Sequence, residues 1–96
     1  MCQLDRLHSL RGEIYEIARK HKADKVYVFG SCARKEETPE SDIDLLVELQ
    51  KGVSFHDLLG LQDGFEKLLG CRVDVVSKNG LSPFIRSTVL SEAVLL

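Results

Sequence analysis

The stretch that decides the fold runs from residue 25 to residue 49. It reads Lys25-Val26-Tyr27-Val28-Phe29-Gly30-Ser31, then ten further residues, then Asp42-Ile43-Asp44-Leu45-Leu46-Val47-Glu48-Leu49. Two short segments rich in β-branched and apolar residues predict two strands. The polar residues 36–41 include Pro39 and predict a loop between them, after a short helical stretch over residues 32–35.

The flanking sequence predicts helices and a third strand. Apolar residues at three- and four-residue steps predict an amphipathic helix over residues 4–21. Ser54 is a good N-cap and Gly70 a good terminating residue, which predicts a helix between them. The remaining predicted elements are a strand over residues 71–77, a turn at Asn79-Gly80 and a helix from Pro83 to about Leu90. This order predicts an α/β (α+β) fold, a small mixed sheet flanked by helices, as a single domain over residues 1–96.

Composition excludes several classes of protein. Thirteen Lys and Arg against fifteen Asp and Glu give a net charge of −2, which argues against binding duplex DNA but allows a nucleotide or RNA end at one site. Three isolated cysteines predict reduced thiols and a cytoplasmic protein. The sequence contains neither a signal peptide nor the roughly 20 apolar residues that span a bilayer, so we expect no membrane association.

Asp42 and Asp44 are the first candidates for chemistry. Residues two apart in a strand point to the same face, so both carboxylates would lie on the face opposite Ile43 and Leu45. Two carboxylates held together repel each other unless a cation lies between them, and Mg²⁺ prefers oxygen ligands. The alternative is that Asp42 caps the loop and Asp44 is a solvated strand end.

Gly30, Ser31 and Arg34 are candidates for binding phosphate. A glycine at a strand end lets the backbone approach a phosphate closely, and the amides of the following turn can donate to it. The Ser31 hydroxyl and the Arg34 guanidinium would add further donors. The alternative is a structural turn in which Ser31 caps a helix and Arg34 is solvated.

Asp74 is the third candidate carboxylate. It lies in a strand predicted to be mostly buried, where an ionised carboxylate needs a partner or a metal. A carboxylate facing Asp42 and Asp44 would complete a metal cluster or serve as a general base. The alternative is a structural ion pair with Arg72, which would share its face.

These motifs together resemble those of the polymerase-beta-like nucleotidyltransferase superfamily. Gly30-Ser31-Cys32-Ala33-Arg34 followed by Ser41-Asp42-Ile43-Asp44-Leu45-Leu46-Val47 is most similar to its minimal members, and the likeness covers nearly the whole chain. The resemblance implies that Asp42 and Asp44 hold two Mg²⁺ ions. It also implies that Asp74 binds one of them and helps to deprotonate an attacking hydroxyl. Gly30 and Ser31 would bind the β- and γ-phosphates of ATP or another nucleoside triphosphate.

The resemblance also implies a biological role. Many minimal members resemble antitoxins that transfer AMP to a partner toxin with a HEPN domain, and this is the leading hypothesis for the acceptor. A contact inhibitor without catalysis and nucleotide transfer to a small molecule are the alternatives. The acceptor, the base preference, any homo- or hetero-oligomer and the need for a partner stay open.

The apolar residues of the last helical stretch are expected in the core, with a partner surface as the alternative: Leu81, Phe84, Ile85, Val89 and Leu90.

Overall fold

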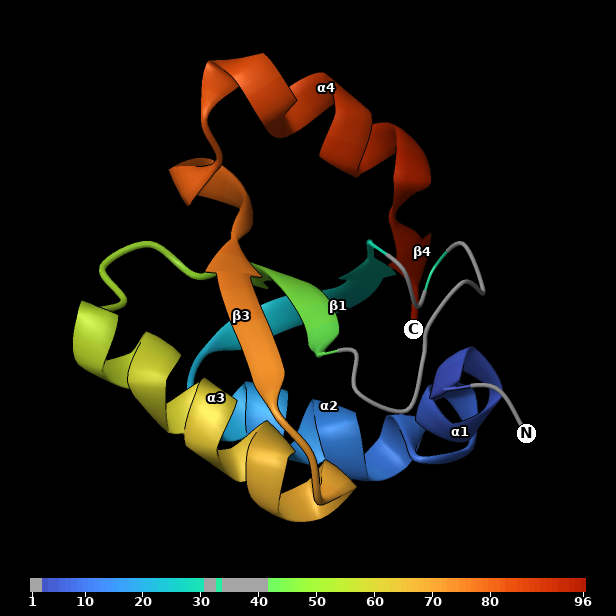
Figure 1. Cartoon of the computed structure of the whole chain (residues 1–96). Helices are drawn as coiled ribbons and strands as arrows, with labels where there is room; N and C mark the ends of the chain where they lie inside the picture. Colours follow the sequence, from blue (N-terminus) through green and yellow to red (C-terminus); the bar gives the residue numbers. More distant parts are fainter. Residues whose placement is uncertain (1–2, 31–32, 34–41) are drawn as a thin grey trace.

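The computed structural model describes residues 3–30, 33 and 42–96, in which a small sheet is flanked by helices (Figure 1). The elements are α1 (Gln3–Ser9), α2 (Arg11–Lys20), β1 (Ala23–Phe29), β2 (Ile43–Leu49), α3 (Phe55–Leu69), β3 (Val73–Ser77), the 3₁₀ helix η1 (Lys78–Gly80), α4 (Pro83–Glu92) and β4 (Val94–Leu95). The predicted helical stretch at residues 32–35 lies outside the described residues except for Ala33, which is in a turn.

The four strands form one mixed sheet in the order β3-β2-β1-β4. Strands β2 and β3 are parallel, while β1 is antiparallel to both β2 and β4. A parallel pair needs a long crossover, and α3 supplies it here. The small mixed sheet flanked by helices that the sequence predicts is therefore confirmed. Strand β4 was not predicted, because two residues carry no recognisable alternation.

The main core lies between one face of the sheet and the helices α1, α2 and α3 (Figure 1). Alternate residues of β2, Ile43, Leu45 and Val47, are fully buried on this face, as the period of two in a strand predicts. Helix α4 covers part of the opposite face, where Leu46 packs with Leu81 and Val89. Asp44 therefore has an apolar neighbour two residues along its own face of β2.

The predicted first helix is divided into α1 and α2 at Leu10. The Leu10 amide donates to the carbonyl oxygens of both Arg6 and Leu7, at 3.1 and 3.2 Å, which ends α1 in a tighter turn. The Ser9 hydroxyl also donates to the Arg6 carbonyl at 2.7 Å. A serine that bonds to the backbone in this way competes with the helical ladder. The apolar period continues across the break, so the sequence pattern alone predicts one helix.

Helix α3 begins and ends where the sequence predicts. The Ser54 hydroxyl accepts a hydrogen bond from the Asp57 amide, and the Asp57 carboxylate accepts one from the Ser54 amide, each at 3.4 Å. This capping box satisfies donors that the first helical turn would otherwise leave without partners. Gly70 ends the helix with φ of 71°, a left-handed conformation that favours glycine. These two ends fix the length of the crossover that sets β3 beside β2.

Some apolar side chains that the sequence places in the core are exposed. Leu81, just before α4, and Val89 on α4 are buried as expected. On α4, however, Phe84 is 95% exposed, Ile85 is 51% exposed and Leu90 is 37% exposed. On α3, Phe55 is also exposed, at 72%. Phe84 and Phe55 lie in the first turns of their helices, so the helical period does not decide their burial. None of the described helices is long and apolar enough to cross a membrane.

Candidate active site

The parallel pairing of β2 and β3 sets Asp44 directly opposite Asp74. Paired residues in neighbouring strands point to the same face, and the strands lie about 4.8 Å apart. Both carboxylates are on the sheet face that carries α4, because Ile43, Leu45, Val73 and Val75 occupy the other face. The structure thus brings two of the three predicted carboxylates together across the sheet.

The charges along this face follow the strand pairing. At one end Arg72 Nε lies 3.5 Å from Asp42 Oδ1, and at the other Lys78 Nζ lies 3.2 Å from Glu48 Oε1. Between them, Asp44 faces Asp74 and Leu46 faces Val76. Like charges directly opposite each other destabilise a sheet. The strand pairing therefore sets two like charges opposite each other at Asp44 and Asp74.

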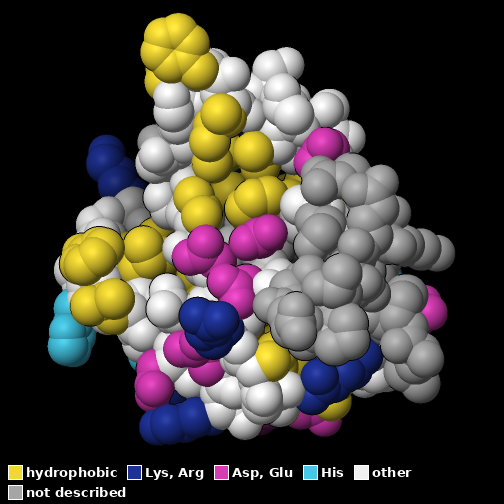
Figure 2. Space-filling view, in the orientation of Figure 1, with side chains coloured by type: hydrophobic (Ala, Val, Ile, Leu, Met, Phe, Trp, Pro, Cys, Tyr) yellow, Lys and Arg dark blue, Asp and Glu magenta, His cyan; other side chains and the backbone are white. Residues whose placement is uncertain are grey.

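The acidic side chains gather in the middle of one face of the molecule (Figure 2). They lie over β2 and β3, next to an apolar group on the α4 side, and Lys and Arg side chains lie as separate patches on their other side. Asp74 is exposed and Asp44 is half-buried, so an ion or a substrate can reach the pair from solvent.

Gly30 lies against the Asp44 carboxylate. Its φ is +73°, and a Cβ atom added to it would collide with Asp44 Oδ2. The strand pairing explains the contact, because Phe29 is the partner of Asp44 and Gly30 follows directly. The sequence predicts a glycine that allows close approach at this point. In the described residues the group that approaches it is the carboxylate of Asp44.

Asp42 is on the same face but is drawn toward Arg72. Its side chain is 47% exposed and lies one position before β2. Among the described residues, no three His, Cys, Asp or Glu side chains converge closely enough to hold one metal ion. Asp44 and Asp74 face each other, with Asp42 two residues before Asp44, and a hard divalent cation prefers such oxygen donors. Asp42, Asp44 and Asp74 thus supply the kind of donor that Mg²⁺ prefers, while the Asp42 carboxylate lies against Arg72.

Two features of Asp74 differ from the prediction. The sequence places it in a mostly buried strand, but β3 is at the edge of the sheet and Asp74 is exposed. Asp74 is therefore not a buried carboxylate, and what sets it apart is the like charge of Asp44 opposite it. The structural alternative, an ion pair of Asp74 with Arg72, is also wrong, because Arg72 pairs with Asp42. Ser31 and Arg34, the other predicted phosphate ligands, lie outside the described residues.

A hydrogen-bonded group near the other end of the face was missed by the sequence analysis. The Tyr27 hydroxyl donates to Glu48 Oε2 at 2.8 Å, and Lys78 donates to Oε1 of the same carboxylate at 3.2 Å. The hydrogen bond from Tyr27 lowers the pKa of Glu48 despite the opposing effect of partial burial, and Lys78 adds to the lowering. The same hydrogen bond raises the pKa of Tyr27. The alternation of β2 sets Glu48 on the same face as Asp44. Its partners Tyr27 and Lys78 come from other segments, so only the strand pairing brings them together.

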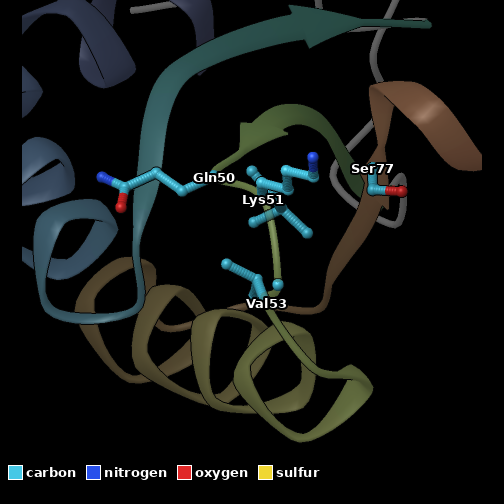
Figure 3. Close-up of a pocket in the computed structure, with 6 residues that line it drawn as sticks. Gln50, Lys51, Val53 and Ser77 are labelled. Atoms are coloured by element: carbon cyan, nitrogen blue, oxygen red, sulfur yellow. The ribbon is translucent and has the colours of Figure 1, made fainter.

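A pocket of about 490 Å³ lies elsewhere in the fold (Figure 3). It is lined by Leu49, Gln50, Lys51, Gly52, Val53 and Ser77. These residues are at the carboxyl ends of β2 and β3, and Leu49 is five residues from Asp44, roughly 16 Å along the strand. The carboxylate pair and Gly30 are therefore the candidate site, and this pocket is separate from it.

Known proteins share both the sequence and the fold. Residues 12–96 match the family model described as nucleotidyltransferase domain. The protein adenylyltransferase MntA of Thermococcus cleftensis is 36% identical over 95 residues, which cover 98% of this chain and 96% of that protein. A solved structure described as a candidate minimal nucleotidyltransferase is 43% identical, covers 97% of this chain and 95% of its own, and has a TM-score of 0.86.

A more distant likeness concerns the fold alone. A chain in the structure of a tri-AMPylated Shewanella oneidensis HEPN toxin in complex with MNT antitoxin is 22% identical, with a TM-score of 0.68. The likeness covers 99% of this chain and 71% of that one. The match to the family model and the relatives above 30% identity carry the assignment. The chain belongs to the nucleotidyltransferase domain family and is an enzyme of the minimal nucleotidyltransferase type.

Proposed function

We propose that this protein transfers AMP from ATP to a hydroxyl group of a HEPN-domain partner, with Mg²⁺ as cofactor, as the antitoxin of a toxin–antitoxin pair. The observation that carries the chemistry is the Asp44–Asp74 pair, two carboxylates that face each other across parallel strands. Such a pair is unfavourable by itself and becomes favourable when a divalent cation neutralises it. Asp42, two residues before Asp44, would supply the third carboxylate.

The residues divide the work of the transfer. Bound Mg²⁺ would neutralise charge on the triphosphate and the attacking oxygen. Asp42, Asp44 and Asp74 would hold it, and Gly30, Ser31 and Arg34 would bind the phosphates. The hydroxyl oxygen forms a bond to the α-phosphorus, the bond from that phosphorus to the β-bridging oxygen breaks, and pyrophosphate leaves. The proton of the hydroxyl goes to the Asp74 carboxylate.

Exposure of Asp74 supports a macromolecular acceptor. The edge strand β3 has no strand beyond it in the described sheet, and Asp74 is open to solvent. A hydroxyl on the surface of another protein can reach such a carboxylate without entering a deep pocket. The described pocket of about 490 Å³ lies near the opposite ends of these strands. The protein adenylyltransferase named among the relatives supports the same acceptor class.

The direct test is transfer of label from α-³²P-ATP. The purified chain is incubated with Mg²⁺ and labelled ATP, with and without its HEPN partner, and the Asp44→Asn variant is run in parallel. We expect label in the partner, one pyrophosphate released per AMP transferred, and no label with Asp44→Asn. Equal labelling by the variant would overturn the assignment of the site. The same reaction with the other three nucleoside triphosphates measures the base preference.

Inhibition of the partner by contact alone is the second candidate function. The exposed Phe84 and Ile85 of α4 favour it, because large exposed apolar side chains are typical of protein interfaces. The labelling experiment separates the two functions. A HEPN partner that is inhibited without receiving label, equally by the wild type and by Asp44→Asn, would favour contact inhibition.

A further inference from the structure

Arg72 lies at the edge of the candidate site and is held there through its backbone. Its carbonyl oxygen accepts a hydrogen bond of 3.1 Å from the Ile43 amide, which fixes residue 72 beside residue 42. Its side chain is 82% exposed, and Nε lies 3.5 Å from Asp42 Oδ1. Arg72 is two residues before Asp74 and shares its face of the sheet. The guanidinium is therefore next to the carboxylates that we assign to the cation.

This ion pair has little effect on stability. Exposed ion pairs contribute about 0–1 kcal/mol, because water screens both charges. Its effect on the site is more direct, since a metal ion and a guanidinium compete for the same carboxylate oxygens. In the described residues the third carboxylate is drawn to Arg72, and no three-ligand group is formed. A cation that binds Asp42 would therefore compete with Arg72 for this carboxylate.

We propose that Arg72 is an internal counter-ion that occupies Asp42 until a divalent cation displaces it. Arg72 thereby offsets the repulsion of Asp42 by the Asp44–Asp74 pair in the metal-free protein and lowers the affinity of the site for a divalent cation alone. Arg72 is a positioning residue, because it acts through Asp42. The inference rests on the proposed role of Asp42 as a metal ligand.

The test is a titration of the full chain with Mn²⁺, without nucleotide or partner. The electron paramagnetic resonance signal of free Mn²⁺ measures how much of the ion is bound. We expect Arg72→Gln to bind Mn²⁺ about two- to fivefold more tightly than the wild type, the range that an exposed ion pair allows. The difference narrows as KCl is raised, because salt screens exposed charges. Lys78→Gln is the matched control, since it removes one positive charge from the other end of the same sheet face.

A double-mutant cycle identifies the route of the effect. In an Asp42→Asn background, Arg72→Gln should no longer change Mn²⁺ affinity, because the carboxylate that Arg72 occupies is gone. Unchanged or weaker binding by Arg72→Gln, an equal gain in Lys78→Gln, or the same gain in the Asp42→Asn background would each overturn the inference. A thermal melt of each variant confirms that the fold is kept.

The outcome is separable from that of the proposed function. Tighter Mn²⁺ binding by Arg72→Gln without any nucleotide transfer by the wild type would sustain the counter-ion and overturn the transferase. Transfer by the wild type with unchanged Mn²⁺ affinity in Arg72→Gln would sustain the transferase and overturn the counter-ion.

Discussion

The two ends of the β2–β3 face use the same kinds of residue in opposite ways. Near the carboxyl end of β2, Glu48 accepts hydrogen bonds from Tyr27 and Lys78, so its charge is compensated inside the protein. Near the amino end, Asp44 faces Asp74, a second carboxylate. The same backbone pairing thus supports an attractive arrangement and a repulsive one, about four residues apart on β2.

The contrast between Glu48 and the Asp44–Asp74 pair assigns a stabilising role to one end of the sheet face and the proposed catalytic role to the other. The group around Glu48 stabilises the protein by itself, because each charge has a partner of opposite sign or a hydrogen-bond donor. The pair of Asp44 and Asp74 sets two like charges opposite each other, and we propose that a cation offsets their repulsion. Neutralising Asp74 should therefore lower activity and raise stability, whereas neutralising Glu48 should lower stability and leave most of the activity.

The largest expected effect is on activity. Asp74→Asn should lower the rate of nucleotide transfer by about a hundredfold or more, because it removes the carboxylate that we propose as a cation ligand and as the acceptor of the hydroxyl proton. Glu48→Gln, which neutralises a carboxylate at the other end of the same face, should keep at least half of the wild-type rate. Steady-state labelling of the partner measures both variants, and equal losses would contradict the division between the two ends.

The next largest effect concerns Gly30. Gly30→Ala should lower the free energy of unfolding by about 1–3 kcal/mol, because alanine is strained at positive φ and its Cβ would collide with the Asp44 carboxylate. Gly12→Ala is the control, since no atom lies within 4 Å of the added Cβ and the site is helical. It should raise the free energy of unfolding by about 0.5–1 kcal/mol. Urea denaturation distinguishes them, and a stabilised Gly30→Ala would contradict the observed contact.

A smaller effect is expected at Tyr27. Tyr27→Phe should lower the free energy of unfolding by about 1 kcal/mol, because the Glu48 carboxylate loses a hydrogen-bond donor. The pKa of Glu48 is lowered by folding, so its contribution is present above the ordinary value of 4.5 and is lost as pH falls through the folded pKa.

The pKa of Tyr27 moves in the other direction. Folding raises it, so its contribution is present below the ordinary value of 10.0 and is lost as pH rises through the folded pKa. Stability measured from pH 3 to pH 11 should therefore fall less steeply at both extremes in Tyr27→Phe than in the wild type. Identical pH profiles would contradict the coupling of Tyr27 to Glu48.

The smallest effect has the opposite sign. In the absence of divalent cations, Asp74→Asn should raise the free energy of unfolding by about 0.2–1 kcal/mol, because it removes a like charge directly opposite Asp44. Glu48→Gln should lower it. Thermal melts in EDTA at low ionic strength measure both changes. A destabilised Asp74→Asn would mean that the Asp44–Asp74 pair is already compensated in the metal-free protein.

Local features of the fold could be predicted from the sequence. The period of two in β2 assigns Ile43 and Leu45 to the core, and the structure confirms their burial. Ser54 and Gly70 mark the ends of α3, because capping depends on a few neighbouring residues. The division of the first helix at Leu10 could not be predicted, since the apolar period continues through it.

The arrangement of the site depends on contacts between segments far apart in the chain. The sequence by itself determined which face of β2 carries its acidic side chains, because alternation is a property of a single strand. Only the tertiary structure set Asp44 opposite Asp74, Asp42 beside Arg72 and Gly30 against Asp44. The physical reason is register: a shift of one residue between β2 and β3 would bury the aspartates and expose the valines. The packing of α3 and the core against both strands therefore selects the pairing.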